Sequence, residues 1–334
     1  NSLLLILNFL FLKPLRKELK KTYWKYMAIS TLDAIDLSRN FGSNIAVNDI
    51  SFSLQKGEVL GFLGPNGAGK STTMRMLTGN LAPSDGSVKI CGFDMVANPK
   101  KAKEMIGYLP EMRPLYKEFT VDEFLTIAAR FHKVQSSKIR RSVDSAKDKC
   151  GLTHMSKRLI ENLSNGYQQR VGIAQAIIHD PEIVILDEPT VGLDPIQIRE
   201  IRKLIKDIGK KHSVILSTHI LPEVEMVCDR VQIINQGDLV FNGSIEDLKK
   251  QRRGNKLLVG FNNAPLKKEL LAIEGVIQVD KIDNTMYRVH FNHEYVPAEE
   301  IVITATKKKW GLFHVAPDVT SLEDIFVQLT QLEK

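Results

Sequence analysis

One eight-residue stretch, 64–71, constrains this chain more than any other part of the sequence. It reads Gly-Pro-Asn-Gly-Ala-Gly-Lys-Ser and matches the pattern G-x-x-x-x-G-K-[ST] at every fixed position. In loops of this pattern the backbone N–H groups cradle phosphate oxygens, the lysine reaches the β- and γ-phosphates, and the hydroxyl binds Mg²⁺. We therefore expect a nucleotide site that uses Lys70 and Ser71 in these two roles. The residues expected to bind phosphate are Gly64, Pro65, Asn66, Gly67, Ala68, Gly69, Lys70, Ser71 and Thr72.

The residues on either side of this loop predict the strand and the helix that the pattern requires. Residues 58–63 form an apolar run typical of a buried strand, and 71–77 follow with a helical pattern that ends before Gly79. A helix that begins at the loop directs its N-terminus at bound phosphate. An ordinary glycine-rich turn is the alternative, and the Lys-Ser pair at 70–71 disfavours it.

The distribution of charge argues against a nucleic-acid partner. The chain has 334 residues and a formal net charge of +7, but residues 1–26 hold +5 of it. The rest of the chain is too weakly basic to form the electrostatic footprint of a DNA- or RNA-binding protein. The 3 cysteines lie far apart in the sequence, so neither a disulfide framework nor a zinc site is expected.

Residues 1–26 differ from the remainder of the chain. An apolar run at 3–12 precedes a basic stretch, and it is about half the length that a membrane-spanning helix needs. A signal peptide has its positive charge before the apolar run and not after it. The segment is either a surface anchor or an extension outside the fold. We favour the extension and expect the first domain to begin at Met27.

The segments from 27 to 245 alternate between strand and helix patterns. Strands are expected at 32–37, 47–54, 87–91, 183–186, 213–217 and 231–234. Helices are expected over a long stretch, 99–162, and over 163–179. A capping box at 120–123 begins one helix, whose apolar positions 121, 124, 125 and 128 form a buried face. Buried strands that alternate with helices predict an α/β domain with a mainly parallel sheet.

A second, smaller domain is expected after a charged linker at 246–255. Residues 256–334 predict strands at 256–261, 276–282, 286–291 and 311–316, with helices at 266–273, 298–308 and 321–332. This βαββαβ order with a last helix suits a ferredoxin-like α+β domain. No motif that carries chemistry lies in it.

Polar residues follow two of the expected parallel strands. Asp187 and Glu188 come directly after the strand at 183–186, and His219 follows the strand at 213–217. Ligands of such sheets bind beyond the carboxyl ends of the strands. One carboxylate can therefore hold Mg²⁺ while the other orients or activates a water molecule. Ser164 and Gly166 begin a helix and form a second anion site, which a nucleotide held between two chains would need.

These motifs, in this order, resemble the ATP-binding cassette (ABC) of ABC transporters over residues 28–245. Residues 64–71 resemble Walker A, 183–187 Walker B, 163–167 the ABC signature, and 191–194 the D-loop. The resemblance implies the ABC type of P-loop NTPase fold, with an antiparallel β subdomain and a helical subdomain beside the parallel sheet.

The resemblance also implies a role for each matching residue. Glu188 is then the catalytic glutamate and His219 the switch histidine, with ATP and Mg²⁺ as ligands. Phe41 matches the aromatic residue that stacks on adenine, with an ordinary strand-end aromatic as the alternative. The implied Mg²⁺ ligands are Ser71, Asp187 and Glu111. The implied ATP contacts outside the phosphate loop are Phe41, Glu111, Ser164, Gly166 and Asp194.

The sequence departs from the family pattern at three places. The signature, usually Leu-Ser-Gly-Gly-Gln, has Asn165 for its first glycine and Tyr167 for its last residue. The Q-loop region, 107–111, offers Glu111 where glutamine is usual. The D-loop begins with Val191 and not with serine. Ser164 and Gly166, the signature residues expected to contact phosphate, are present.

The resemblance is strongest to ATPases of type-two exporters, which drive drug, polysaccharide, sodium or gliding-motility-associated export. It implies an ATPase subunit at the cytoplasmic face of the cell membrane, peripheral, that works with a second cassette and with integral-membrane permease subunits. The alternative is a cassette ATPase that acts on ribosomes or DNA. Translation-factor cassettes usually come in pairs within one chain, and DNA-associated ones insert long coiled coils. Only 94 residues without heptads separate Lys70 from Ser164. A catalytically inactive regulatory cassette conflicts with the presence of all the catalytic positions.

An apolar cluster after Glu111 is the expected docking surface for the membrane partner. It consists of Met112, Pro114, Leu115, Tyr116 and Phe119, which share no helical face. Ordinary core packing is the alternative.

Overall fold

The computed structural model describes residues 30–250, 255–292, 295–318 and 326. These residues form two units that divide between Asn242 and Gly243, and each unit is described by itself. The predicted extension 1–26 lies outside the described residues, and so does the predicted last helix, apart from Phe326.

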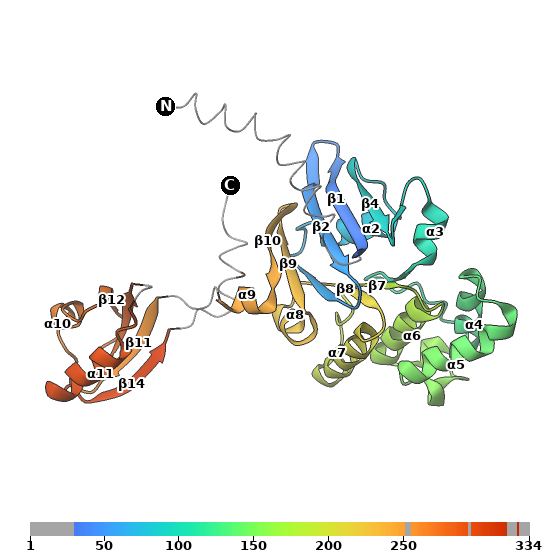
Figure 1. Ribbon diagram of the computed structural model, residues 1–334. Coiled ribbons are helices and arrows are strands. Elements are labelled where there is room, and N and C mark those ends of the chain that lie inside the picture. Colours follow the sequence, from blue (N-terminus) through green and yellow to red (C-terminus); the bar gives the residue numbers. More distant parts are fainter. Residues whose placement is uncertain (1–29, 251–254, 293–294, 319–325, 327–334) are drawn as a thin grey trace, which may run out of the picture. The chain divides into compact units, whose positions relative to one another are not determined.

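A six-stranded sheet forms the centre of the first unit (Figure 1). Its strands, in spatial order, are β10 (Asp238–Ser244), β9 (Arg230–Asn235), β3 (Val59–Leu63), β8 (Ser213–Thr218), β7 (Ile183–Asp187) and β6 (Ile106–Leu109). The five strands from β9 to β6 pair in parallel. Every residue of β3, β7 and β8 is buried, because helices or the second sheet cover both faces. The predicted parallel α/β sheet is confirmed.

A smaller antiparallel sheet packs against one face of the central sheet. Its order is β2 (Asn44–Gln55), β1 (Ser30–Phe41), β4 (Asp85–Ile90) and β5 (Phe93–Asp94). The ring centres of Phe52 on β2 and Phe62 on β3 lie 5.8 Å apart. Helix α2 (Lys70–Leu77) contributes Met74 and Leu77 to the same core. This core fixes the strand and the helix on either side of the phosphate loop.

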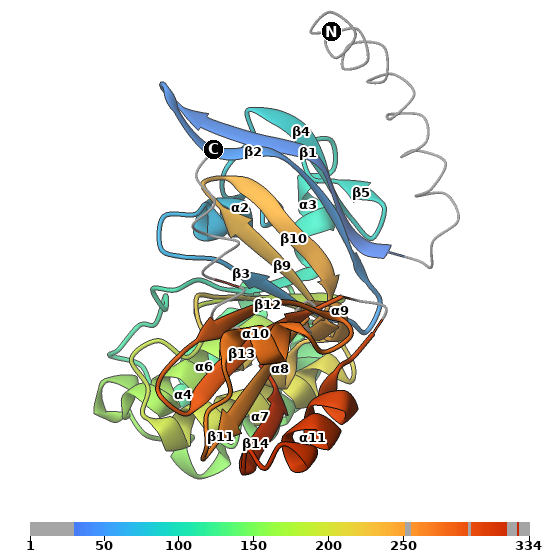
Figure 2. The same cartoon turned by 90° about the vertical axis from the view of Figure 1, so that its left-hand side faces the viewer.

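Helices cover the remaining part of the central sheet. The α-helices are α3 (Pro99–Glu104), α4 (Val121–Phe131), α5 (Ile139–Lys149), α6 (Asn165–Ile177), α7 (Pro195–Gly209) and α8 (Leu221–Val227). Short 3₁₀ turns η1 (Ser136–Lys138), η2 (Thr153–Met155) and η3 (Ile160–Asn162) lie between them. In Figure 1 the antiparallel sheet, coloured blue to cyan, lies at the top of this unit, and the green helices α4 and α5 lie at its lower right; the sheet is also at the top of this unit in Figure 2.

The prediction of a long helical stretch over 99–162 is wrong, because strand β6 interrupts it. This four-residue strand is too short to show a two-residue period in the sequence. Gly107 within it packs so closely against α6 that a Cβ atom would lie 1.9 Å from the Ala176 carbonyl oxygen. The predicted capping box of α4 is confirmed, with Thr120 as the N-cap and Glu123 as its partner. The predicted apolar face of α4 is buried.

The second unit has the predicted ferredoxin-like topology (Figure 1, orange to red). Its elements are α9 (Ile245–Lys250), β11 (Lys256–Phe261), α10 (Lys267–Leu271), β12 (Val276–Lys281), β13 (Met286–Phe291), α11 (Ala298–Lys307) and β14 (Leu312–Pro317). The strand order is β12-β13-β11-β14, and every neighbouring pair is antiparallel. Helix α9 begins at Ile245 and overlaps the first half of the stretch, 246–255, that the sequence predicted as a linker.

Candidate nucleotide site

The pairing of the parallel strands brings the expected site residues to one edge of the sheet. Asp187 at the end of β7 pairs with Ser217 of β8, and Leu63 at the end of β3 pairs with Thr218. The phosphate loop leaves β3 at this edge, so its residues lie beside the carboxylates that follow β7. Ligands of parallel α/β sheets bind at such edges.

The backbone of the phosphate loop holds the Lys70 side chain through hydrogen bonds to its carbonyl oxygens. Gly69 has φ +107°, and a Cβ atom there would lie 2.5 Å from the Ala46 carbonyl oxygen, so only glycine fits. Lys70 is buried, and its Nζ donates to the carbonyl oxygens of Gly64 at 2.9 Å and Pro65 at 3.1 Å. The lysine ammonium and the free N–H groups at the start of α2 therefore lie together, as an anion-binding loop requires.

Glu188 lies between two basic side chains. Its Oε1 is 3.3 Å from Lys70 Nζ, and its Oε2 is 2.9 Å from His219 Nδ1. Glu188 itself is buried and has φ +49°, a left-handed conformation that non-glycine residues seldom adopt. Such backbone outliers concentrate at functional sites. Glu188 is thus in direct contact with both Lys70 and His219, two further residues that the sequence assigned to the site.

Asp187 is buried beside Glu188 but lacks its basic neighbours. Burial raises the pKa of its carboxyl, and the nearby Glu188 and Glu111 charges add to this effect, while the hydroxyls of Ser217 and Ser71 oppose it. Its Oδ1 has no hydrogen-bond partner among the described residues. A buried carboxylate oxygen left available next to a serine hydroxyl fits a hard cation that prefers oxygen ligands. Asp187, Ser71 and Glu111 therefore fit Mg²⁺.

Lys70, Glu188 and His219 line a cavity of about 390 Å³. Its lining is Ala46, Asn66, Gly67, Gly69, Lys70, Ser71, Thr72, Glu111, Glu188, Val191 and His219. Most of the lining was predicted from motifs. Ala46 was missed, because an alanine on an edge strand carries no chemical signal, and Val191 had been noted only as a departure from the D-loop pattern.

Three expected phosphate contacts within the loop, Gly64, Pro65 and Ala68, are absent from this lining. Four of the five ATP contacts expected outside the loop are absent as well: Phe41, Ser164, Gly166 and Asp194. Phe41 ends β1 and is 44 % exposed, with the Arg39 guanidinium 4.6 Å from its ring centre. The Asp194 carboxylate accepts hydrogen bonds from the backbone N–H groups of Ile196 and Gln197, both at 2.9 Å. Asp194 thus caps α7 in this chain.

The signature residues stand at the start of α6. Ser164 is the N-cap, and its hydroxyl makes no capping hydrogen bond. Gly166 packs against α7, where a Cβ atom would lie 2.7 Å from Gln197 Cδ. Arg113, two residues after Glu111, donates from Nη1 to the Asn165 carbonyl oxygen at 2.9 Å. This bond joins the loop that reaches the cavity to the start of the signature helix.

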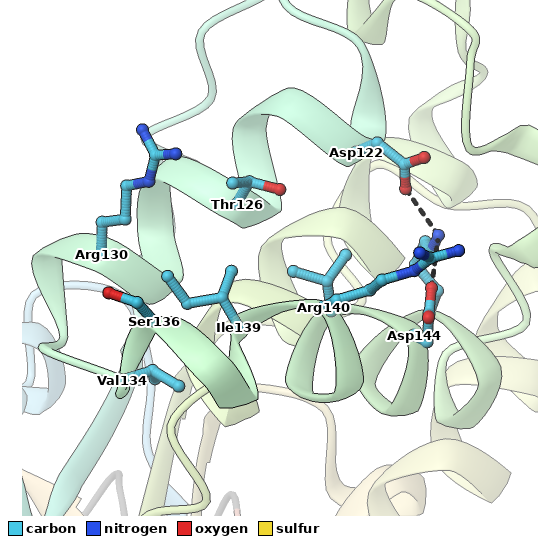
Figure 3. Close-up of a pocket in the computed structure, with 10 residues that line it drawn as sticks. Asp122, Thr126, Arg130, Val134, Ser136, Ile139, Arg140 and Asp144 are labelled. Carbon is cyan, nitrogen blue, oxygen red and sulfur yellow. Dashed lines mark hydrogen bonds and ion pairs between the residues drawn. The ribbon is translucent and has the colours of Figure 1, made fainter.

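A larger hollow of about 800 Å³ lies between α4 and α5, away from the motifs (Figure 3). Lys147 is its most buried basic side chain, and Asp122 and Asp144 neutralise it at 2.5 Å and 3.1 Å. The charge of this lysine is therefore already matched within the protein.

Comparison with protein families agrees with the geometry of the site. The family model "ABC transporter" matches residues 47–191, and "ATP-binding protein DrrA1-3-like, C-terminal domain" matches 243–330. The bacitracin transport ATP-binding protein BcrA of Bacillus licheniformis is 39 % identical over 65 % of this chain and 71 % of its own length. The chain belongs to the ABC transporter family. The family resemblance and the ABC-type fold inferred from the motifs are both confirmed.

Other relatives of this ABC protein cover both of its units. The linearmycin resistance ATP-binding protein LnrL of Bacillus subtilis is 32 % identical over 90 % of this chain and 98 % of its own length. A solved structure described as the ATP-binding subunit of an ABC transporter has a TM-score of 0.61 at 30 % identity, covering 66 % of this chain and 93 % of that one. No helix of the ABC protein, among the residues described, is long and apolar enough to cross a membrane.

Proposed function

We propose that this chain is the ATP-hydrolysing subunit of an ABC exporter. A further relative, the Nod factor export ATP-binding protein I of Rhizobium sp., supports the export direction, since it is named for export. The subunit would act at the cytoplasmic face of the cell membrane, bound peripherally to integral-membrane permease subunits. ATP hydrolysis to ADP and phosphate would drive the movement of those subunits.

The contact of Glu188 with His219 and Lys70 is the observation that carries this proposal. In the proposed mechanism the phosphate loop and Lys70 bind the β- and γ-phosphates of ATP. Ser71, Asp187 and Glu111 would hold Mg²⁺, which neutralises phosphate charge when it is bound. Glu188 orients and activates the attacking water, and His219 fixes the position of the Glu188 carboxylate through the 2.9 Å contact.

The positions of Ser164 and Gly166 support a dimer. Both residues lie outside the cavity lining of their own chain, yet they begin a helix whose free N–H groups suit an anion. In the proposed dimer they contact the ATP that is bound to the phosphate loop of a second cassette. Each ATP would then be buried between two chains, and hydrolysis would separate them.

Replacing the catalytic carboxylate tests the proposal. Glu188→Gln keeps the shape of the side chain but removes the base, so ATP turnover should fall by about 100-fold or more. ATP binding should remain, and ATP should convert the variant to a dimer on size-exclusion chromatography. Lys70→Ala should instead weaken ATP binding itself.

A matched control lies at the other end of the same strand. Glu182 precedes β7, is exposed, and is remote from the cavity, so Glu182→Gln should hydrolyse ATP at the wild-type rate. Wild-type turnover by Glu188→Gln would refute the assignment of Glu188, whatever the control shows.

A further inference from the structure

Glu223 on α8 is a carboxylate that the proposed mechanism does not use. It is 1 % exposed and receives two hydroxyl hydrogen bonds. Thr190 Oγ1 donates to its Oε1, and Thr218 Oγ1 donates to its Oε2 at 2.9 Å. Both threonines are buried as well. We call this arrangement of Glu223 with Thr190 and Thr218 the Glu223 clasp.

The two threonines lie next to the proposed catalytic pair in the sequence. Thr190 lies two residues after Glu188, beyond the end of β7, and Thr218 lies directly before His219, at the end of β8. The Thr218 hydroxyl also accepts a hydrogen bond from the backbone N–H of Ile220 at 3.1 Å. A single hydroxyl thus fixes the backbone before and after His219.

The charge of Glu223 indicates that this side chain does more than pack α8 against the sheet. A buried carboxylate loses its hydration, and an apolar side chain of similar volume would pack α8 against the sheet without that penalty. The Arg202 guanidinium of α7, 3.7 Å from Glu223 Oε1, offsets part of the cost. Two oxygens on one rigid group accept bonds from two loops, which sets the distance between those loops more strictly than apolar contact does.

We propose that Glu223 is a positioning residue for ATP hydrolysis. By holding Thr190 and Thr218, the Glu223 clasp keeps Glu188 in its left-handed conformation and within 2.9 Å of His219. The inference rests on the proposed roles of Glu188 and His219. It assigns to α8 and α7 a part in catalysis, although neither contributes a residue to the lining of the ATP cavity.

Removal of one hydroxyl at a time tests the clasp without removing the buried charge. Thr190→Val and Thr218→Val keep the side-chain shape but cannot donate to Glu223. Each should lower kcat by about 10- to 100-fold, the effect of a small misplacement of a catalytic group. KM for ATP and the affinity for a nonhydrolysable ATP analogue should stay within about 2-fold, because the phosphate loop is untouched. Thr190→Ser and Thr218→Ser keep the donor and should restore most of kcat.

Thr78→Val is the matched control. Thr78 is also buried, and its hydroxyl donates to the Met74 carbonyl oxygen at 3.0 Å, at the end of α2 remote from both loops. This variant should keep the wild-type kcat. In a His219→Ala background, Thr218→Val should cause little additional loss, because Thr218 acts through the adjacent His219.

The outcomes separate the clasp from the proposed function. If Glu188→Gln abolishes turnover but both valine variants keep the wild-type kcat, the clasp is refuted and the proposed function stands. Equal losses of kcat in the serine and valine variants, or a rise in KM as large as the fall in kcat, would also refute it, because a merely structural defect produces that pattern. Normal turnover in Glu188→Gln would overturn the proposed function on which the clasp depends.

Discussion

Two adjacent carboxylates, Asp187 and Glu188, have opposite electrostatic surroundings. Lys70 and His219 contact Glu188, whereas Asp187 has an oxygen without a hydrogen-bond partner among the described residues, and burial raises the pKa of its carboxyl. The charged form of Asp187 therefore destabilises the folded protein, and the proposed Mg²⁺ would offset this effect. Functional sites often carry such a loss of stability.

Asp187→Asn should stabilise the protein without its ligands. The amide removes a buried negative charge, so at neutral pH the Tm should rise by about 2–4 °C, the shift that roughly 1 kcal/mol produces in a domain of this size. Mg²⁺ with ATP should then stabilise the variant much less than the wild type. Thermal unfolding monitored by circular dichroism, with and without MgATP, measures both effects.

The difference in Tm between Asp187→Asn and the wild type should depend on pH in one direction. The folded protein binds the Asp187 proton more readily than the unfolded chain does, because the pKa in the folded state is raised. The destabilisation is absent below the ordinary pKa of an aspartate and develops as the pH rises through the raised value. The Tm advantage of Asp187→Asn should therefore disappear in acid. Asp148→Asn, on the exposed side of α5, should show no advantage at any pH.

Individual residues of the site could be predicted where the residues that act together lie close together in the sequence. The residue types of the phosphate loop and of the pair at 187–188, together with the strands that precede them, indicate a nucleotide site. The Glu223 clasp could not be predicted, because its members are 33 and 5 residues apart and meet only when β7, β8 and α8 have packed. Asp194 has the residue type of a helix cap, and the family resemblance alone suggested a nucleotide contact.

At the scale of elements, the loop from β6 to α4 connects the ATP cavity with the signature helix. It begins with Glu111 in the cavity lining, continues through the bond from Arg113 to Asn165, and ends at the N-cap of α4. Element prediction failed next to this loop, because a four-residue strand buried by close helix packing has no period of its own. The prediction of α4 succeeded, because the residues of its cap and of its apolar face lie close together in the sequence.

Thr120→Ala should destabilise the first unit by about 1 kcal/mol, the usual cost of a lost N-cap. The Thr120 hydroxyl accepts a hydrogen bond from the Glu123 N–H, and the Glu123 carboxylate accepts one from the Thr120 N–H at 2.8 Å. Urea denaturation measures the loss as a lower midpoint. Thr126→Ala within the same helix should cause no loss, and an equal loss there would contradict the role of the cap.

At the scale of the whole molecule, the division at 242/243 coincides with the start of the second family match at residue 243. We propose that the two units fold independently. Limited trypsin digestion should then cut first within the basic stretch 249–253 and leave two fragments that resist further digestion. If early cuts fall within the six-stranded sheet, or if the released cassette fragment unfolds, the two-domain proposal fails.

We propose that a membrane partner docks beside the loop from β6 to α4. A hollow of about 190 Å³ lies beside the loop from β6 to α4, and its lining includes Tyr116 and Phe131. These side chains are 53 % and 78 % exposed, whereas Leu115 and Phe119 of the predicted docking cluster are only half-exposed. Exposed apolar side chains around a hollow suit an amphipathic helix of a partner protein.

Tyr116→Glu combined with Phe131→Glu should therefore separate this subunit from the proposed permease. Charged side chains cannot enter an apolar interface without a large loss of hydration, so binding should weaken by more than about 10-fold. The ATPase activity of the isolated subunit should survive, because neither residue lines the ATP cavity. Copurification of integral-membrane proteins with the tagged subunit measures binding. Val96→Glu is the control, since Val96 is exposed and apolar but lies in the turn before α3. Wild-type copurification by the double variant would show that the permease binds to another surface.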